Sequence, residues 1–427
     1  MKHRMQLFLL PILSSVLLSA CSNTILTEEK ELFRFETQES TYSVEVKKVD
    51  DLNAEIVLET GYSDTDLLLS ENEKFTEEES SVLVADEDAE ILVEDLGGDF
   101  AYCQMEEADR PVYDAIFDIL RKGQKGVKVP TVDPGQIDRA FNCVMLDHPE
   151  LFYVNGYTYT KYSVKGEIQS IDFSGSYTME EVDIRQNQEQ LVKRCNEILK
   201  EMPQESDYLK VKYMYEYIIL NTEYEQGSKD NQNVLSVFLH GKSVCQGYAK
   251  AMQYLALAAG LDSVLVTGTV NDGEGHAWDI IELEDDYYHV DVTWGDASYN
   301  SNEKAENVSV PDINYDYLCV STEEIKRSHK IESELKLPIC DHLENNYYVR
   351  EGAYFTTMDE EQIRVLFENG YANGEHFITL KCSDETVYEQ MYQYLLKDIH
   401  IFEYVQGNPD QIVYTLNEQQ NSMSFWL

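Results

Sequence analysis

The chain has 427 residues, 43% of them hydrophobic, and 80 acidic side chains against 33 Lys and Arg give a formal net charge of −47. This length accommodates several folded units, and the charge argues against binding to nucleic acid or other anionic polymers. Long-range attraction instead favours cationic peptides or proteins as partners.

The N-terminus has the three parts of a secretory signal. A positive segment at 2–4 precedes an apolar run at 7–18, which is too short to span a bilayer, and small residues follow up to Cys21. Because it ends in cysteine, the segment resembles a bacterial lipoprotein signal, which implies that Cys21 is lipidated. We predict a signal peptide over 1–20 and a mature protein anchored outside the cytoplasmic membrane. An ordinary secretory peptide, cleaved elsewhere, is the alternative and leaves the protein extracytoplasmic too.

Residues 21–100 are dominated by Glu and Asp. Such a composition buries little apolar surface, so we predict an acidic, flexible stalk. Strand-like runs at 42–46 and 81–84 leave open a small β element.

Residues 101–200 are expected to form a helical and β extension. Apolar periodicity predicts helices over 112–120 and 137–146, and alternating residues between 157 and 171 predict strands. We interpret His148, which precedes a proline at an element boundary, as structural.

A cysteine opens the next well-defined helix. Apolar positions recur at helical spacing after Cys245, and Gly260 supplies a C-terminal stop. At a helix start, free N–H groups and the positive end of the dipole favour a thiolate, and the same N–H groups can receive an oxyanion. Cys245 is therefore a candidate nucleophile.

A histidine and an aspartate follow on a predicted hairpin. Strand patterns begin at His276 and lead, through a turn at 284–286, to a second strand that reaches Asp291. Directly opposed residues of such a hairpin have an odd sequence separation and share a face. His276 and Asp291 meet this condition, so we expect a hydrogen bond that orients the imidazole. Asp279 has the wrong parity for this role.

Two other interpretations compete with a catalytic triad. Each residue alone is more often structural, since a cysteine at a helix start usually packs and a histidine before Ala-Trp is usually structural. A zinc site of Cys245, His276 and His289 is the second, but the paired ligand spacing of zinc motifs is missing. We therefore predict no metal and no cofactor.

The segments around these residues resemble the transglutaminase-like superfamily, and in particular its bacterial branch, which is similar to the kyphoscoliosis peptidase and cytokinesis-protein group. The resemblance covers roughly 208–296. It is carried by the motifs Cys245-x-Gly247-Tyr248-Ala249, Val266-x-Gly268, His276-Ala277-Trp278 and Asp291-x-Thr293-Trp294.

The resemblance implies an α+β fold with a papain-like core over 201–330, in which the nucleophile helix packs on an antiparallel sheet. It also implies Cys245 as nucleophile, His276 as general base and acid, and Asp291 as the orienting carboxylate. Unlike animal transglutaminases, the chain has Gln246 after the cysteine and no recognisable calcium loop, so calcium dependence is not implied. A second oxyanion donor is unassigned, with Tyr224 and Gln246 as candidates by residue type.

The last part of the chain, 345–427, is predicted to be a small α+β domain. Its pattern indicates strands at 347–349, 377–380, 412–416 and 422–427, and helices at 359–368 and 384–396. Six cysteines remain besides Cys21 and Cys245, and they allow either three disulfides or six free thiols.

The sequence therefore predicts an extracytoplasmic thiol enzyme that acts on peptide or amide bonds through a thioester. We favour hydrolysis, because calcium-dependent crosslinking features are missing. A protein-crosslinking transglutaminase and a non-catalytic cell-surface binding module are the alternatives. The expected partner is a protein or peptide substrate, such as a cell-wall or surface protein.

Overall fold

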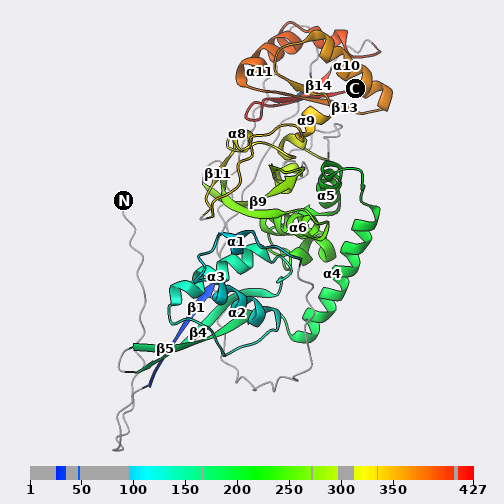
Figure 1. Cartoon of the computed structure of the whole chain (residues 1–427). Helices are drawn as coiled ribbons and strands as arrows, with labels where there is room; N and C mark the ends of the chain where they lie inside the picture. The colour runs from blue at the N-terminus through cyan, green and yellow to red at the C-terminus, as the bar shows by residue number, and fades with distance from the viewer. Residues whose placement is uncertain are drawn as a thin grey trace, which may run out of the picture.

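The computed structural model describes residues 26–34, 47–48, 96–164, 167–270, 273–296, 312–333, 335–407 and 412–427. Cys21, the predicted signal peptide and most of the predicted stalk lie outside these ranges, as do the strand-like runs at 42–46 and 81–84. Figure 1 shows three successive parts: an N-terminal unit (96–177, cyan), a core (207–331, green to yellow) and a C-terminal domain (345–427, orange to red).

The N-terminal unit packs helices on an antiparallel sheet of order β1-β4-β5-β3. Its two long helices confirm the predicted ones, and Asp133 caps the second by accepting a hydrogen bond from the N–H of Gly135. The elements are α1 (Phe100–Gln104), α2 (Arg110–Arg121), α3 (Pro134–Asp147), β1 (Leu26–Arg34), β3 (Val127–Lys128), β4 (Val154–Val164) and β5 (Glu167–Tyr177).

Two strands come from the predicted stalk. β1 pairs along its whole length with β4, and β2 (Lys47–Lys48) pairs with β14 of the C-terminal domain. The rest of 21–95 lies outside the described residues, so its flexibility stays a prediction.

A helix that we did not predict, α4 (Glu181–Glu201), follows the N-terminal unit and runs beside the core in Figure 1. Its buried residues recur at helical spacing: Ile184, Gln188, Leu191, Cys195 and Ile198. The buried face is narrow and the other faces are polar, so the helix depends on tertiary packing.

The core contains two helices beside an antiparallel sheet of order β10-β9-β8-β11. As predicted, one helix begins at Cys245 and is followed by Gly260, whose φ is +76°. The main elements are α5 (Asp207–Asn221), α6 (Cys245–Ala258), β8 (Ser263–Val270), β9 (Glu274–Leu283), β10 (Asp286–Val290) and β11 (His329–Ile331). Shorter ones are β6 (Glu223–Tyr224), a π-helix (Ser236–His240), β7 (Lys242–Ser243), α7 (Val292–Gly295), a 3-10 helix (Tyr315–Tyr317) and α8 (Thr322–Ile325).

The C-terminal domain has a sheet of order β12-β13-β15-β14-β2 with helices packed on it. Most predicted elements are confirmed, but the predicted strand at 347–349 is wrong. These residues form a helical turn because the Asn346 side chain accepts a hydrogen bond from the Tyr348 N–H, 3.0 Å away. The elements are α9 (Tyr347–Arg350), β12 (Tyr354–Phe355), α10 (Glu360–Asn373), β13 (Phe377–Cys382), α11 (Glu385–Tyr392), a π-helix (Gln393–Lys397), a 3-10 helix (His400–Glu403), β14 (Val413–Asn417) and β15 (Ser422–Trp426).

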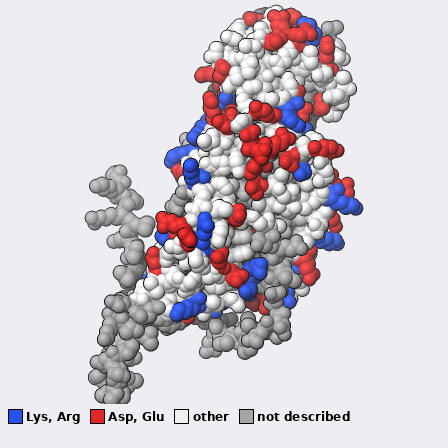
Figure 2. Space-filling model, viewed as in Figure 1, with Lys and Arg blue, Asp and Glu red and all other residues white. Residues whose placement is uncertain are grey.

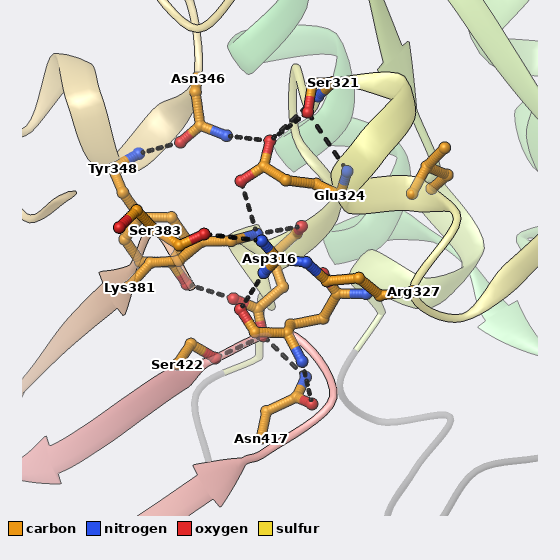
Figure 3. Close-up of polar contacts among 12 residues, drawn as sticks. Asp316, Ser321, Glu324, Arg327, Asn346, Tyr348, Lys381, Ser383, Asn417 and Ser422 are labelled. Atoms are coloured by element: carbon orange, nitrogen blue, oxygen red, sulfur yellow. Dashed lines mark hydrogen bonds and ion pairs between the residues drawn. The ribbon is translucent and has the colours of Figure 1, made fainter. Parts of the chain in front are cut away.

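The three parts meet in different ways. One continuous hydrophobic cluster joins the N-terminal unit to α5 and α6, whereas the C-terminal domain has a separate cluster. Polar contacts connect that domain to the core, and Figure 3 shows them around Lys381 and Asp316. Lys381 lies 3.4 Å from the carboxylate of Glu324, and Asp316 accepts hydrogen bonds from Ser422 and Asn417 at 2.7 and 2.9 Å. These contacts join the C-terminal domain to the core.

The surface in view carries both signs of charge, with Lys and Arg side chains lying between Asp and Glu side chains (Figure 2). The described helices include none that combines the length and the apolar character of a membrane span.

Candidate active site

The candidate nucleophile, Cys245, is the first residue of α6. Val244 before it has extended backbone and no side-chain oxygen, so it does not cap the first turn. The backbone N–H of Cys245 and the positive end of the helix dipole therefore lie next to the thiol. Ala249, one turn further along the helix, packs with Leu265 and Ala277 of the sheet.

The glycine of the Cys245-x-Gly247 motif has a packing reason. A Cβ at Gly247 would lie 2.1 Å from the Ser243 hydroxyl oxygen and 2.6 Å from the Asn231 carbonyl oxygen. The Ser243 hydroxyl itself is buried and lies 3.0 Å from that carbonyl. Only a residue without a side chain lets α6 begin this close to the preceding segment.

The hairpin brings His276 and Asp291 together as predicted. β9 and β10 pair in antiparallel register with Val290 opposite Asp279, and Asp291 comes next. Asp291 thus lies diagonal to His276 on the same face of the hairpin. The two atoms His276 Nε2 and Asp291 Oδ2 are 2.8 Å apart. The other carboxylate oxygen accepts a hydrogen bond from the Trp294 N–H at 3.1 Å, so Asp291 also caps α7.

His276 is enclosed by aromatic rings. Trp278 and Trp294 lie with ring centroids 6.0 and 5.9 Å from the imidazole, and both indoles are buried. Cys245 is 2% exposed and His276 5% exposed. Water is therefore largely excluded from the thiol and imidazole, and a substrate has to displace covering groups to reach them.

The charges of the site favour a protonated His276. Burial by itself would lower the pKa of His276, but the charge of Asp291 and the hydrogen bond to it, together with Cys245, raise that pKa. Burial would raise the pKa of Asp291, yet His276 and His329 hold it well below its usual range. An ionised Asp291 can only accept hydrogen bonds, so Nε2–H of His276 is the donor.

The other ring nitrogen of His276 has different surroundings. Among the described residues, Nδ1 of His276 has no hydrogen-bond partner of standard geometry, although it is buried. Cys245 lies close enough for its thiol to raise the pKa of His276. One nitrogen is thus anchored by Asp291, and the other remains for exchanging a proton with the thiol or substrate.

Sequence reasoning missed His329. Its Nε2 lies 2.9 Å from the same Oδ2 atom of Asp291, so two imidazoles share one carboxylate oxygen. His329 is on β11, the edge strand that pairs with β8. No motif near His329 signals this contact, because 38 residues separate it from Asp291.

His289, the third member of the rival zinc set, has a structural role. Nε1–H of Trp278 donates to Nδ1 of His289 at 3.0 Å, and Nε2 lies 3.2 Å from the Thr322 hydroxyl. Burial lowers the pKa of His289 to about 3, so this imidazole is neutral. Potential ligand atoms do lie within 4.8 Å of one another in His276, Asp291 and His329. Hydrogen bonds between them already occupy these atoms.

A pocket of about 810 Å³ opens on the side of His289 and His329. Cys245 and His276 are not in its lining, so it does not present the candidate nucleophile. The suggested second oxyanion donors stay unassigned: Tyr224 packs against the Tyr248 ring, with centroids 6.3 Å apart, and Gln246 lies in the first turn of α6.

The three-disulfide alternative is not what the structure has. No disulfide joins the following cysteines in the described residues: Cys103, Cys195, Cys319, Cys340 and Cys382. All but Cys103 are buried, and burial raises the pKa of the Cys195, Cys319, Cys340 and Cys382 thiols.

Comparison with protein families gives a match to the transglutaminase-like superfamily over residues 196–292, a range that includes Cys245, His276 and Asp291. This part of the chain is similar to the transglutaminase-like core, and the α+β prediction is confirmed. The comparison with curated proteins found no match.

Several solved structures are similar to the chain. One is a TGase, with 17% identity, 36% of this chain and 48% of that chain covered, and a TM-score of 0.25. Another is a candidate cysteine protease from Cytophaga hutchinsonii, with 16% identity, 33% of this chain and 58% of that chain covered, and a TM-score of 0.22. A third is menin, with its binding site for the Mixed Lineage Leukemia protein, at 14% identity, 54% and 49% covered, and a TM-score of 0.23. The chain spans about half the length of these structures.

Proposed function

We propose that this protein is a cysteine enzyme that cleaves peptide or amide bonds with Cys245 as nucleophile, His276 as acid and base, and Asp291 as orienting carboxylate. One observation carries the proposal. A buried histidine has one ring nitrogen anchored on an ionised aspartate. The other has no hydrogen-bond partner of standard geometry in the described part of the chain, and the thiol of Cys245 at a helix start is close enough to raise the pKa of the ring. Within the superfamily, the motifs favour the bacterial branch, similar to the kyphoscoliosis peptidase and cytokinesis-protein group.

The first half of the reaction forms a thioester. The resting pair is a protonated His276, which holds the proton taken from Cys245, and a thiolate, which attacks the carbonyl carbon of the substrate amide. The backbone N–H of Cys245 donates to the oxyanion of the tetrahedral intermediate. His276 then gives its proton to the leaving amine, and the C–N bond breaks.

The second half releases the acyl group. Neutral His276 takes a proton from water, and the resulting hydroxide attacks the thioester carbonyl. Collapse of this intermediate breaks the C–S bond, releases the carboxylic acid and regenerates the thiolate with protonated His276. If a lysine amine replaces water, the product is an isopeptide crosslink instead. We favour hydrolysis because the calcium loop of animal transglutaminases has no recognisable counterpart in the sequence.

The test measures the alkylation rate of Cys245 by iodoacetamide against pH, with mass spectrometry of its peptide. Cys103 is an internal control, because it is exposed and because burial and Asp99 raise its pKa. An activated Cys245 should be labelled faster than Cys103 at pH 6. This pH is well below the pKa of about 8.5 of an ordinary cysteine, so an ordinary thiol reacts slowly there. The same digest of His276→Ala should lose this difference.

Two outcomes would contradict the proposal. Labelling of Cys245 that rises only near pH 8.5 and does not respond to His276→Ala would remove the triad. A partner that binds equally well to Cys245→Ala, together with an unreactive thiol, would favour the binding module. Release of amine from a peptide library, compared with incorporation of a fluorescent amine, separates hydrolysis from crosslinking.

We also propose that the enzyme is held outside the cytoplasmic membrane by a lipid on Cys21, where surface or cell-wall proteins are available as substrates. The signal pattern of residues 1–21 supports this location. The expected result is partition of the wild-type chain into the membrane fraction and release of a Cys21→Ser variant. Equal partition of both would argue against lipidation.

A further inference from the structure

His329 belongs to a chain of hydrogen bonds that ends at the candidate catalytic residues. Its Nε2 lies 2.9 Å from Asp291, and its Nδ1 lies 2.8 Å from the Ser328 hydroxyl oxygen. That hydroxyl is in turn 3.0 Å from the side-chain nitrogen of Gln420. Each contact is buried, and the chain links β11 of the core to the C-terminal domain.

The donors in this chain have one consistent direction. The amide nitrogen of Gln420 can only donate, so Ser328 Oγ accepts from it. The Ser328 hydroxyl lies 2.8 Å from Nδ1 of His329 and 3.5 Å from the Ile325 carbonyl oxygen. We assign its hydrogen to the shorter contact, with Nδ1, which leaves the ring proton on Nε2. Nε2–H donates to the ionised carboxylate of Asp291. The network therefore assigns one neutral tautomer to His329.

The surroundings of His329 agree with a neutral ring. Burial lowers its pKa and the charge on His276 acts in the same direction, while Asp291 and the Ile325 carbonyl only partly oppose these effects. The positive charge at this site therefore lies on His276. The charged and titratable groups that face it are Cys245 from α6, Asp291 at the start of α7 and His329 from β11.

Gln420 is held in place by the turn between β14 and β15. Arg327 donates to the carbonyl oxygens of Gln420 and Ser383 at 3.2 and 2.9 Å, and Gln419 donates to the Arg327 carbonyl at 2.8 Å. The buried ion pair of Lys381 with Glu324 fixes the same interface (Figure 3). The turn thus holds Arg327, which precedes Ser328, and in this way affects the position of His329.

We propose that His329 is a positioning residue, held by Ser328 and by Gln420 of the C-terminal domain, that sets how strongly Asp291 retains the proton of His276. The proposal rests on the proposed function for its catalytic meaning. Because Nε2–H of His329 also donates to the carboxylate, Asp291 attracts the proton of His276 less strongly. His276 therefore gives its proton to the leaving amine more readily and is neutral when water attacks the thioester. The C-terminal domain is then part of the active site, although it contributes no group to the reacting atoms.

The test follows the protonation of His276 by NMR of the full chain, with ¹⁵N in the imidazole rings. Cys245→Ala serves as the reference, because it removes the thiol and resembles the acylated state in lacking a thiolate. Loss of the donor in His329→Leu should raise the His276 midpoint by about one pH unit. His329→Gln, which keeps an N–H donor, should return the midpoint towards the reference.

Variants of the C-terminal domain keep the test independent of whether His329→Leu folds. Gln420→Ala should shift the midpoint in the same direction by a smaller amount. Glu418→Gln is the matched control, since this exposed side chain lies in the same turn, and it should give no shift. In an Asp291→Asn background, His329→Leu should have no further effect, which a merely structural role would not predict.

An unchanged midpoint in Gln420→Ala and in folded His329→Leu would overturn the proposal, and so would a shift that persists without the Asp291 carboxylate. Failure of the proposed function has a different signature. In that case Cys245 of the wild-type chain reacts no faster than Cys103 at pH 6, while the His276 midpoints still move as described. The alkylation of Cys245 is measured in the presence of EDTA, so that no metal bound by His276, Asp291 and His329 affects the rate.

Discussion

Two buried histidine–carboxylate pairs in this molecule have similar distances and different surroundings. His148 Nδ1 lies 2.7 Å from Glu150 in the N-terminal unit, and His276 Nε2 lies 2.8 Å from Asp291 in the core. The second nitrogen of His148 is 2.9 Å from the Tyr113 hydroxyl, and its ring stacks on Phe117.

The comparison teaches that a buried pair alone does not indicate catalysis. Both nitrogens of His148 have partners, so this ring has no free nitrogen for exchanging a proton with a substrate. His276 keeps one nitrogen without a hydrogen-bond partner among the described residues, next to a thiol at a helix start. This second nitrogen distinguishes the pair that we propose to be catalytic from the structural one.

The largest expected effect separates the two histidines directly. His276→Ala should lower turnover and the alkylation of Cys245 at pH 6 by about 100- to 10,000-fold, the usual contribution of a general acid and base. His148→Ala should leave alkylation within about twofold. It removes the histidine partner of the buried Glu150 carboxylate, while Tyr113 keeps its hydrogen bond to Asp147, and it should cost about 1–3 kcal/mol of stability. Alkylation kinetics and urea unfolding measure the two. Equal losses of reactivity in both variants would break the comparison.

A smaller effect is expected from moving the thiol away from the free nitrogen. Gly247→Ala places a Cβ 2.1 Å from the Ser243 hydroxyl oxygen, so the start of α6 must shift. We expect a loss of about 1–3 kcal/mol in the free energy of unfolding, as for overpacked cores, and slower labelling of Cys245. Gly227→Ala is the control, because a Cβ there meets no atom within 4 Å. Equal stability of the two variants in thermal unfolding would disprove the packing argument.

The smallest effect concerns two buried aspartates with opposite surroundings. Asp291 receives two imidazole donors and has a lowered pKa, whereas Asp279 has neither carboxylate oxygen hydrogen-bonded among the described residues. Burial, followed by the charge of Asp291, raises the pKa of Asp279 well above its usual range. The two should therefore contribute to stability in opposite ways as the pH changes.

The sign of each contribution follows from these directions. Asp291 stabilises the fold above about pH 4, where the unfolded carboxyl is ionised, and this is lost as the pH falls through its lowered folded value. The advantage of wild type over Asp291→Asn should therefore shrink towards pH 2. Asp279 lowers the stability of the fold above about pH 4, because the unfolded carboxyl is ionised there while the folded one stays protonated. The stability of Asp279→Asn relative to wild type should therefore increase as the pH rises. Urea unfolding between pH 2 and 8 measures both, and parallel curves for all three proteins would refute the assignment.

The sequence by itself determined the elements whose information is local. Helical spacing after Cys245 and alternation around His276 predicted α6 and the β9–β10 hairpin, and side-chain parity predicted the contact between His276 and Asp291. Local propensity failed at Tyr347–Arg350, where β-favouring residues follow an Asn346 cap that starts a helical turn instead. The apolar spacing of α4 was readable but was diluted by its many polar residues.

Only the tertiary structure decided what surrounds the pair. His329 reaches Asp291 across 38 residues, and Gln420 reaches Ser328 across 92. No local pattern encodes such contacts, because a histidine or glutamine at those positions has the same propensities whether or not its partner is near. The folded chain brings β11 beside β8, and the polar interface brings the β14–β15 turn to Ser328. Local periodicity therefore placed the reacting groups, and long-range packing supplied the groups that hold them.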